Sequence, residues 1–251
     1  MLPNVDPFVL PSPPAALLDG ASLFVDFDGT LVELADRPDM VVADDPLRDL
    51  LAALGVALGG RLAVVSGRSI AQLDAMLGPI AQDIALSGSH GNEHRWRGVT
   101  AHPVRPAGMD AAGDAMRAFA EQHPGTLVEI KSFGVALHYR MTPEIEEEAK
   151  ALVERLSVEH ELAIQPGKMM SELRIAGGGK GAAVRRLMDR APMAGTRPLF
   201  IGDDVTDEGG FAAAAELGGF GILVGPPRET AAAYNLPDVA ATRDWLAGCT
   251  A

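Results

Sequence analysis

The stretch Ser22-Leu-Phe-Val-Asp-Phe-Asp-Gly-Thr-Leu-Val32 decides the fold, because an apolar run ends there at two carboxylates and a glycine. Short continuous apolar runs are typical of buried parallel strands. Asp26 is therefore expected at the C-terminal end of such a strand, where open α/β sheets bind their ligands. Asp28 follows two residues later, so extended chain directs both carboxylates to one side. On its own the stretch is equally compatible with a solvated Asp-Gly turn, and the rest of the chain has to decide between them.

The composition excludes several classes of partner. The 251-residue chain carries a formal charge of -13, which disfavours nucleic acid and anionic membranes as main partners and leaves a small molecule as the expected one. No stretch has the apolar length of a membrane span. The single cysteine, Cys249, and an N-terminus unlike a signal peptide predict a cytoplasmic protein. The prolines before residue 20 predict an extended N-terminal arm that decorates the structure.

The hydrophobic patterns divide the chain into three segments. Residues 1–105 alternate strand and helix patterns, with strands expected near 22–26, 61–65 and 83–86, which predicts a parallel sheet of Rossmann-like type. Residues 106–175 change to two helices and two hairpins, typical of an antiparallel α+β unit. The parallel pattern resumes over 176–251. We therefore expect one α/β core interrupted by an inserted α+β cap domain, with turn-forming segments at both joints that could act as hinges.

Polar residues gather at one edge of the predicted core sheet. They follow three strands or begin a helix: Asp26 and Asp28, Ser66, Asp203 and Asp204, and Lys180. Several carboxylates at one edge repel each other strongly at low dielectric. A hard divalent cation with oxygen ligands relieves this repulsion, and Mg²⁺ suits a site of few carboxylates that also binds phosphate.

This set of groups is suited to phosphoryl transfer. Asp26 would attack phosphorus, while the metal and Lys180 neutralise the phosphoryl oxygens and Ser66 donates a hydrogen bond to one of them. Asp28 would protonate the leaving alkoxide and later activate water, as general acid-base catalysis allows.

The sequence resembles the haloacid dehalogenase superfamily at four motifs. These are Asp26-Phe27-Asp28-Gly29-Thr30-Leu31, Ser66-Gly67-Arg68, Lys180-Gly181 and Gly202-Asp203-Asp204-Val205-Thr206-Asp207-Glu208. The resemblance implies a phosphatase with an aspartyl-phosphate at Asp26 and acid-base work by Asp28. It also implies Mg²⁺ held by Asp26, the backbone carbonyl of Asp28 and Asp203, with Asp204 or Asp207 helping nearby, and a cap of the C2 type.

A second set of motifs is similar to the trehalose-6-phosphate phosphatases. It comprises Gly88-Ser89-His90-Gly91-Asn92-Glu93-His94-Arg95, Glu129-Ile130-Lys131, His138-Tyr139-Arg140 and Gly202 to Phe211. The resemblance covers most of residues 20 to 225, but not the proline-bearing arm, and Ile175 stands where a proline is expected. It implies hydrolysis of trehalose 6-phosphate to trehalose and phosphate, the last step of trehalose biosynthesis.

The cap hairpins predict a polar sheet face. A two-residue turn at Phe133-Gly134 pairs Lys131 with Ala136 and Glu129 with His138. One face then carries Glu129, Lys131, His138 and Arg140 from the first hairpin, and Gln165, Lys168, Glu172 and Arg174 from the second. Such a face is often merely solvated. Its mixture of carboxylates, amines and guanidinium groups also suits a sugar, and a hinged insertion can act as a lid.

The remaining candidates concern the substrate. By resemblance, the best sugar contacts are Lys131, Arg140, Lys168 and Glu172, with Glu129 on the same face. Arg68, His90 and Glu93 are further substrate-binding candidates, and for His90 and Glu93 substrate or loop positioning is favoured over metal ligation, because an oxygen site needs no imidazole. Two alternatives stay open: another sugar phosphate, such as sucrose phosphate or a glycosyl-phosphoglycerate, and a phosphosugar-binding regulatory protein without turnover.

Overall fold

The computed structural model describes residues 9–34, 41–96, 98–167 and 169–250. The chain forms two compact units. Unit 1 comprises Met1–His102 and Gly179–Ala251, and unit 2 comprises Pro103–Gly178. The segment 106–175, predicted as the inserted domain, lies within unit 2.

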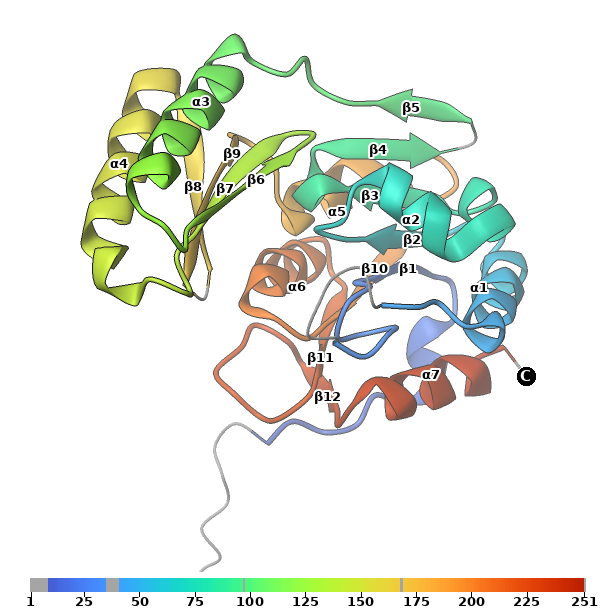
Figure 1. Ribbon diagram of the computed structural model, residues 1–251. Helices are drawn as coiled ribbons and strands as arrows, with labels where there is room; N and C mark the ends of the chain where they lie inside the picture. Colours follow the sequence, from blue (N-terminus) through green and yellow to red (C-terminus); the bar gives the residue numbers. More distant parts are fainter. Residues whose placement is uncertain (1–8, 35–40, 97, 168, 251) are drawn as a thin grey trace, which may run out of the picture. The chain divides into compact units, whose positions relative to one another are not determined.

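Within the described residues, unit 1 contains an eight-stranded sheet (Figure 1). Its strand order is β12-β11-β10-β1-β2-β3-β4-β5. The strands that run parallel are β1 (Ala21–Val25), β2 (Leu62–Val65), β3 (Ala85–Gly88), β10 (Arg197–Gly202), β11 (Phe220–Val224) and β12 (Tyr234–Leu236). Two antiparallel strands, β4 (Glu93–Trp96) and β5 (Val99–Ala101), extend the sheet beyond β3.

Helices cover both faces of this sheet. On one face, α1 (Asp45–Ala57), α2 (Ile70–Leu77) and α7 (Val239–Gly248) pack against Leu23 and Val25 of β1. On the other, α5 (Lys180–Met188) and α6 (Glu208–Glu216) pack against Phe24. Successive strand residues point to opposite faces, so a strand buried on both sides is apolar throughout. The uninterrupted apolar run before Asp26 follows from this arrangement.

The predicted third strand was placed two residues too early. A short 3-10 turn, Gly78–Gln82, precedes it, and the amide of Asp83 donates to the carbonyl of Ile80. Residues 83 and 84 therefore close that turn, and β3 begins at Ala85. The hairpin of β4 and β5, the strand β12 and the helix α7 were not predicted.

The described part of the N-terminal arm is fastened to unit 1. The Pro11 carbonyl accepts a hydrogen bond from the Asn235 amide at 3.0 Å, and the Pro13 carbonyl accepts one from Trp245 Nε1 at 2.9 Å. Asn235 belongs to β12 and Trp245 to α7. The arm thus connects the last strand of the sheet to the last helix.

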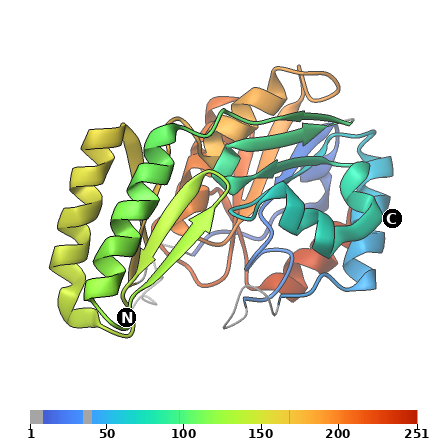
Figure 2. The same ribbon diagram turned by 45° about the horizontal axis from the view of Figure 1, so that its top comes forward.

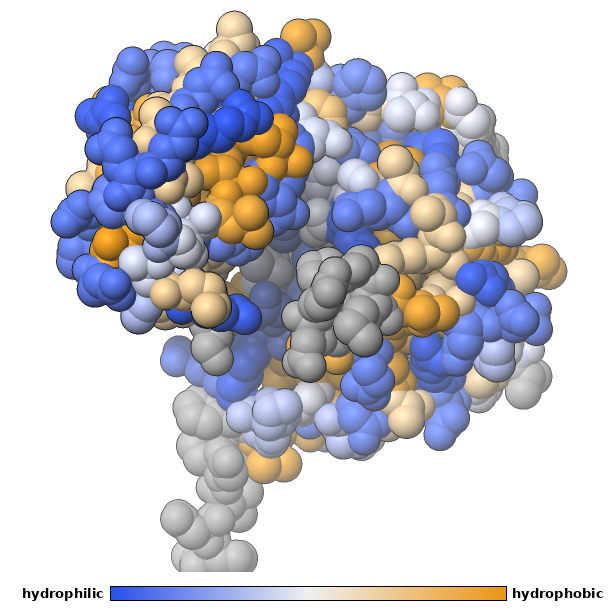
Figure 3. Space-filling view, in the orientation of Figure 1, coloured by the Kyte–Doolittle hydropathy of each residue, from blue (hydrophilic) through white to orange (hydrophobic). Residues whose placement is uncertain are grey.

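Within the described residues, unit 2 contains a four-stranded antiparallel sheet in the order β6-β7-β9-β8, covered on one face by two helices (Figure 2). Its elements are α3 (Ala107–Gln122), β6 (Leu127–Lys131), β7 (Gly134–His138), the 3-10 turn Pro143–Ile145, α4 (Glu146–His160), β8 (Leu162–Gly167) and β9 (Met170–Ile175). The core includes Met116 of α3, Val153 of α4 and Leu137 of β7. Figure 3 shows an apolar patch over β6, where Leu127 and Ile130 are exposed.

The β6–β7 register differs from the predicted one. Lys131 pairs with Gly134 and Glu129 with Ala136, so the turn consists of Ser132 and Phe133. The pairing is shifted by an even number of residues, which leaves each side chain on its predicted face. A Cβ at Gly134 would lie 2.6 Å from Oε1 of Glu172. This glycine therefore serves to make room beside β9 and is not part of the turn.

In the part of the chain that the structure describes, every helix is too short or too polar to span a lipid bilayer.

Candidate active site

The C-terminal ends of neighbouring parallel strands place the predicted polar groups at one edge of the unit 1 sheet. Asp26 follows β1, Ser66 follows the adjacent β2, and Asp203 follows β10 on the other side. The Asp26 amide donates to the Ile201 carbonyl at 2.9 Å, which continues the β1–β10 ladder up to the carboxylate. The strands themselves thus bring the acids together.

Lys180, the first residue of α5, bonds to two of the acids. Its Nζ lies 2.7 Å from Asp26 Oδ1 and 2.5 Å from Asp207 Oδ1. All three side chains are buried. Burial alone would lower the pKa of Lys180, but the carboxylates of Asp26 and Asp207 outweigh it and raise this pKa above its usual value. The lysine therefore stays charged.

Asp26, Asp203 and Asp207 form a cluster in which one oxygen of each lies within 4.8 Å of the others; Asp26 and Asp207 are buried and Asp203 is half-buried. Burial, followed by repulsion from neighbouring acids, raises the pKa of Asp203 to about 6. Burial likewise raises the pKa of Asp26 and Asp207, although Lys180 opposes the rise. When ionised, three carboxylates and one ammonium leave two negative charges uncompensated. A divalent cation with oxygen ligands fits this donor set.

Asp204 lies outside this cluster. Its side chain is exposed, and Oδ1 accepts from the Val205 amide at 2.6 Å. It thereby caps the 3-10 turn Val205–Asp207. Asp207 returns the contact, because its Oδ2 accepts from the Asp204 amide at 3.0 Å. The sequence does not decide between Asp204 and Asp207 as the additional metal ligand, but the two side chains differ in burial. Asp207 belongs to the acid cluster, whereas Asp204 stabilises the turn that carries Asp207.

Asp28 is bound to Arg68 and is not part of the cluster. Arg68 Nη2 donates to Asp28 Oδ1 at 2.6 Å, and its Nε lies 2.8 Å from Oδ2. Such charge-assisted paired bonds fix the orientation of a carboxylate. The Arg68 amide also donates to Ser66 Oγ at 3.1 Å. Arg68, predicted as a substrate contact, therefore links the loops that carry Asp28 and Ser66.

Glu93 holds a loop in place. Its Oε2 accepts from the amide of Ile70, the first residue of α2, at 2.8 Å, and its Oε1 accepts from Ser89 Oγ at 2.7 Å. His90 lies in this loop with a positive φ of 53°, and its amide donates to the Ser66 carbonyl at 3.1 Å. Both oxygens of Glu93 are thus used to join α2 to the loop after β3. Among the described residues, the acid cluster includes no imidazole.

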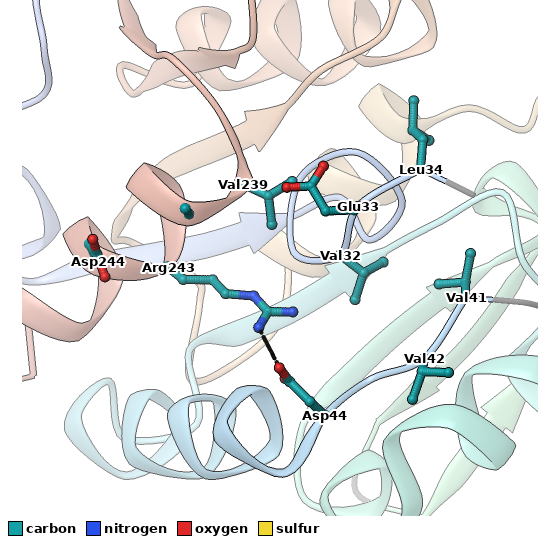
Figure 4. A pocket seen from close by; sticks show the side chains of 10 residues that line it. Val32, Glu33, Leu34, Val41, Val42, Asp44, Val239, Arg243 and Asp244 are labelled. Atoms are coloured by element: carbon teal, nitrogen blue, oxygen red, sulfur yellow. Dashed lines mark hydrogen bonds and ion pairs between the residues drawn. The ribbon is translucent and has the colours of Figure 1, made fainter. Parts of the chain in front are cut away.

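The loop after Asp28 is also anchored from the C-terminal helix (Figure 4). Arg243 of α7 donates from Nε to the Leu31 carbonyl at 2.7 Å and from Nη1 to Asp44, the N-cap residue of α1, at 3.0 Å. These residues border a pocket of about 540 Å³ lined by Val32, Glu33, Leu34, Val41, Val42, Asp44, Val239, Ala240, Arg243 and Asp244. None of the predicted site residues lines it.

In unit 2, the polar sheet face carries two ion pairs. Lys131 Nζ bonds to Oε2 of the buried Glu172, and His138 Nε2 lies 3.1 Å from Glu129 Oε2. The bond with His138 lowers the pKa of Glu129. Arg105 Nη1 donates to the carbonyls of Lys131 and Ser132, both at 2.6 Å. This arginine, which the sequence patterns did not single out, holds the β6–β7 turn.

Arg140, a predicted sugar contact, stands apart from that face. Arg140 comes after the end of β7, in a turn, and is exposed. The strand pairing therefore does not place it on the polar face. Lys168 lies outside the residues that the structure describes.

A parallel sheet has a buried carboxylate at one strand end, a second acid two residues on, and a lysine that bonds to the first carboxylate and to a further acid. Together with the family match, this arrangement defines a phosphatase of the haloacid dehalogenase superfamily. The family model described as "Trehalose-phosphatase" matches residues 24–240. The chain therefore belongs to the trehalose-phosphatase family.

Individual relatives agree with this assignment. The chain is 37% identical over 226 residues to the trehalose-6-phosphate phosphatase of Escherichia coli, covering 89% of this chain and 84% of the relative. It is also 37% identical over 234 residues to a probable trehalose-phosphate phosphatase of Sinorhizobium fredii, covering 92% and 88%. A solved trehalose-6-phosphate phosphatase related protein, 26% identical, superposes with a TM-score of 0.75 and covers 91% of this chain and 96% of its own.

Gly29 provides a test of how tightly the acid cluster is packed. It has a φ of 82°, and a Cβ there would lie 2.2 Å from Asp203 Oδ2. We expect Gly29→Ala to displace Asp203 and to lower kcat by ~100-fold or more, since such small misplacements can cost this much. Phosphate release measured at several Mg²⁺ concentrations checks this.

Gly20→Ala is the matched control, because Gly20 has a similar φ of 66° but nothing within 4 Å of its Cβ position. It carries the left-handed strain of about 1–2 kcal/mol without the clash, and it should unfold more easily while keeping its activity. Equal activity losses in the two variants would contradict the packing explanation.

Proposed function

We propose that this phosphatase hydrolyses trehalose 6-phosphate to trehalose and phosphate through an aspartyl-phosphate on Asp26, with Mg²⁺ as the metal. The observation that carries the proposal is the bond between Asp26 and Lys180 inside the buried acid cluster. The trehalose-6-phosphate phosphatase of Escherichia coli, similar over most of its length, supports the choice of sugar. A cytoplasmic reaction is part of the proposal and agrees with the single cysteine, Cys249.

In the first half-reaction, an Asp26 carboxylate oxygen attacks phosphorus while the bond from phosphorus to the sugar oxygen breaks. Asp28 gives a proton to the departing sugar oxygen. In the second half-reaction Asp28 takes a proton from water, which attacks phosphorus and releases phosphate, so that Asp26 is regenerated. One carboxyl group serves both steps because it alternates between acid and base. Arg68 supports this role by fixing the Asp28 side chain.

Lys180 serves the nucleophile in two ways. Its ammonium group bonds to Asp26 and Asp207 and so keeps Asp26 in one rotamer. Its charge also favours the ionised, nucleophilic form of Asp26, against the effect of burial. Ser66, on the neighbouring strand end, is assigned to donate a hydrogen bond to a phosphoryl oxygen.

Asp26, Asp203 and Asp207 are assigned to hold Mg²⁺, together with the backbone carbonyl of Asp28 that the superfamily resemblance implies. The bound cation would supply positive charge to the phosphoryl oxygens. We assign Asp207 in preference to Asp204, because Asp207 is buried in the cluster while Asp204 is exposed and caps a turn.

The sugar is assigned to the polar face of unit 2. Lys131 and Glu129 of β6 and Glu172 of β9, on the two sides of β7, offer charged donors and acceptors, as sugar hydroxyls require. A site built from such groups rejects sugars that leave buried partners unpaired. Arg140 and Lys168 stay in the proposal as further contacts, on the resemblance alone.

Phosphate release from a panel of esters tests the substrate. With Mg²⁺ present, trehalose 6-phosphate should give the highest kcat/KM, above sucrose phosphate, a glycosyl-phosphoglycerate and p-nitrophenyl phosphate. A chelator should abolish turnover, and Mg²⁺ should restore it. Another sugar as the best substrate would overturn the assignment to trehalose, and absence of turnover on every ester would favour a regulatory protein that only binds phosphosugars.

Asp26→Asn tests the covalent route. We expect kcat to fall by at least ~1000-fold, as for the loss of other nucleophiles. Binding of trehalose 6-phosphate, measured by calorimetry, should persist. Asp19→Asn, which alters an exposed aspartate that precedes β1, is the control and should keep full activity. Near-normal turnover in Asp26→Asn would refute the aspartyl-phosphate.

Lys131→Ala tests the sugar site. We expect kcat/KM for trehalose 6-phosphate to fall by about 10- to 100-fold, which corresponds to losing a hydrogen bond with a charged group. Turnover of p-nitrophenyl phosphate should stay unchanged, because that ester has no sugar to bind. Lys150→Ala removes a lysine of α4 that pairs with Glu146 and should alter neither reaction. Equal losses on both esters in Lys131→Ala would contradict a role in sugar binding.

A further inference from the structure

Arg228 lies in the segment after β11 and bonds to residues 203–208. The part of this stretch from Asp203 to Asp207 is called the metal-binding loop below. Its Nη2 donates to the Asp204 carbonyl at 3.0 Å and lies 3.4 Å from the Asp203 carbonyl. Its Nη1 bonds to Glu208 Oε1, and also donates to the Glu229 carbonyl at 3.1 Å. One guanidinium group thus contacts the successive backbone carbonyls of Asp203 and Asp204.

Glu208 completes this bridge from the other side. It is the first residue of α6, next to Asp207 of the acid cluster. Its Oε1 bonds to Arg228, and its Oε2 accepts from the Ala231 amide at 2.8 Å. The segment around Arg228 is therefore attached to the metal-binding loop at two points, through a half-buried ion pair.

We propose that Arg228, oriented by Glu208, is a positioning residue that sets the metal affinity of Asp203 and Asp207. It touches neither substrate nor metal, and acts through the backbone that carries the two carboxylates. The inference rests on the proposed Mg²⁺ site. Groups that orient metal ligands from outside typically change metal affinity by about 10- to 100-fold when they are removed.

The sign of the effect separates positioning from simple charge. A guanidinium group beside a cation site repels the cation, so removing its charge alone would tighten Mg²⁺ binding. Removing the bridge instead frees the Asp203–Asp204 backbone and weakens binding. The two explanations therefore predict opposite changes in Kd.

The test is Mg²⁺ binding to the full-length, metal-free protein, measured by isothermal titration calorimetry. We expect Arg228→Ala to raise the Kd by about 10-fold or more. Arg228→Lys keeps the charge but cannot reach Glu208 and two carbonyls together, so its Kd should rise as well. The Mg²⁺ concentration for half-maximal phosphate release should increase in parallel, while kcat at saturating Mg²⁺ returns close to the wild-type value.

The matched control is Arg185→Ala. Arg185 forms an exposed ion pair with Glu216, the last residue of α6, just as Arg228 pairs with the first. This variant should bind Mg²⁺ as the wild type does. Circular dichroism shows whether each variant is folded.

Unchanged or tighter Mg²⁺ binding by Arg228→Ala would overturn the inference while leaving the proposed function intact. A loss of kcat that saturating Mg²⁺ does not restore would also overturn it. If the wild type itself bound no Mg²⁺, the metal assignment of the proposed function would fail, and the inference with it.

Discussion

The burial of three carboxylates beside one lysine is the constraint on which the rest of unit 1 depends. Asp26, Asp203 and Asp207 repel each other at low dielectric, and Lys180 offsets only part of this repulsion. Burial raises the pKa of each acid, so the ionised carboxylates lower the stability of the fold. A cation bound between them would offset this cost. Backbone bonds hold the acids in place against this repulsion: the Asp26 amide donates to the Ile201 carbonyl, and the Asp204 amide donates to Asp207 Oδ2.

The core could be predicted from the sequence because its signals are local. A strand buried on both faces must be apolar, and a ligand site at its end must be polar. The apolar run therefore identifies the strand, and the acids that follow it identify the site. The strands expected near 22–26 and 61–65 correspond to β1 and β2 for the same reason. The short strands β4, β5 and β12 lack such a run. They lie at the two ends of the sheet, where a strand need not be buried on both faces.

The details that escaped prediction depend on contacts between distant residues. Gly134 is compatible with a turn in the sequence, yet in the fold it makes room for Glu172, and this moves the β6–β7 turn to Ser132 and Phe133. Nothing local distinguishes Arg105 or Arg228 from surface arginines, because the backbone carbonyls that they bond to lie up to 27 residues away in the sequence. Likewise, Asp204 and Asp207 differ only in burial, which their spacing does not reveal.

The bond from Arg243 to the Leu31 carbonyl reaches the loop after Asp26 from outside the region that the family model matches. The match to the family model ends at residue 240, yet Arg243 lies three residues beyond it and supports the loop that follows Asp26. Trp245, on the same helix, donates from Nε1 to the Pro13 carbonyl of the N-terminal arm. Residues outside the matched region thus hold the loop that follows Asp26, through Arg243, and the N-terminal arm, through Trp245. Changes in these terminal segments of the chain can therefore shift that loop without altering any residue of the four motifs.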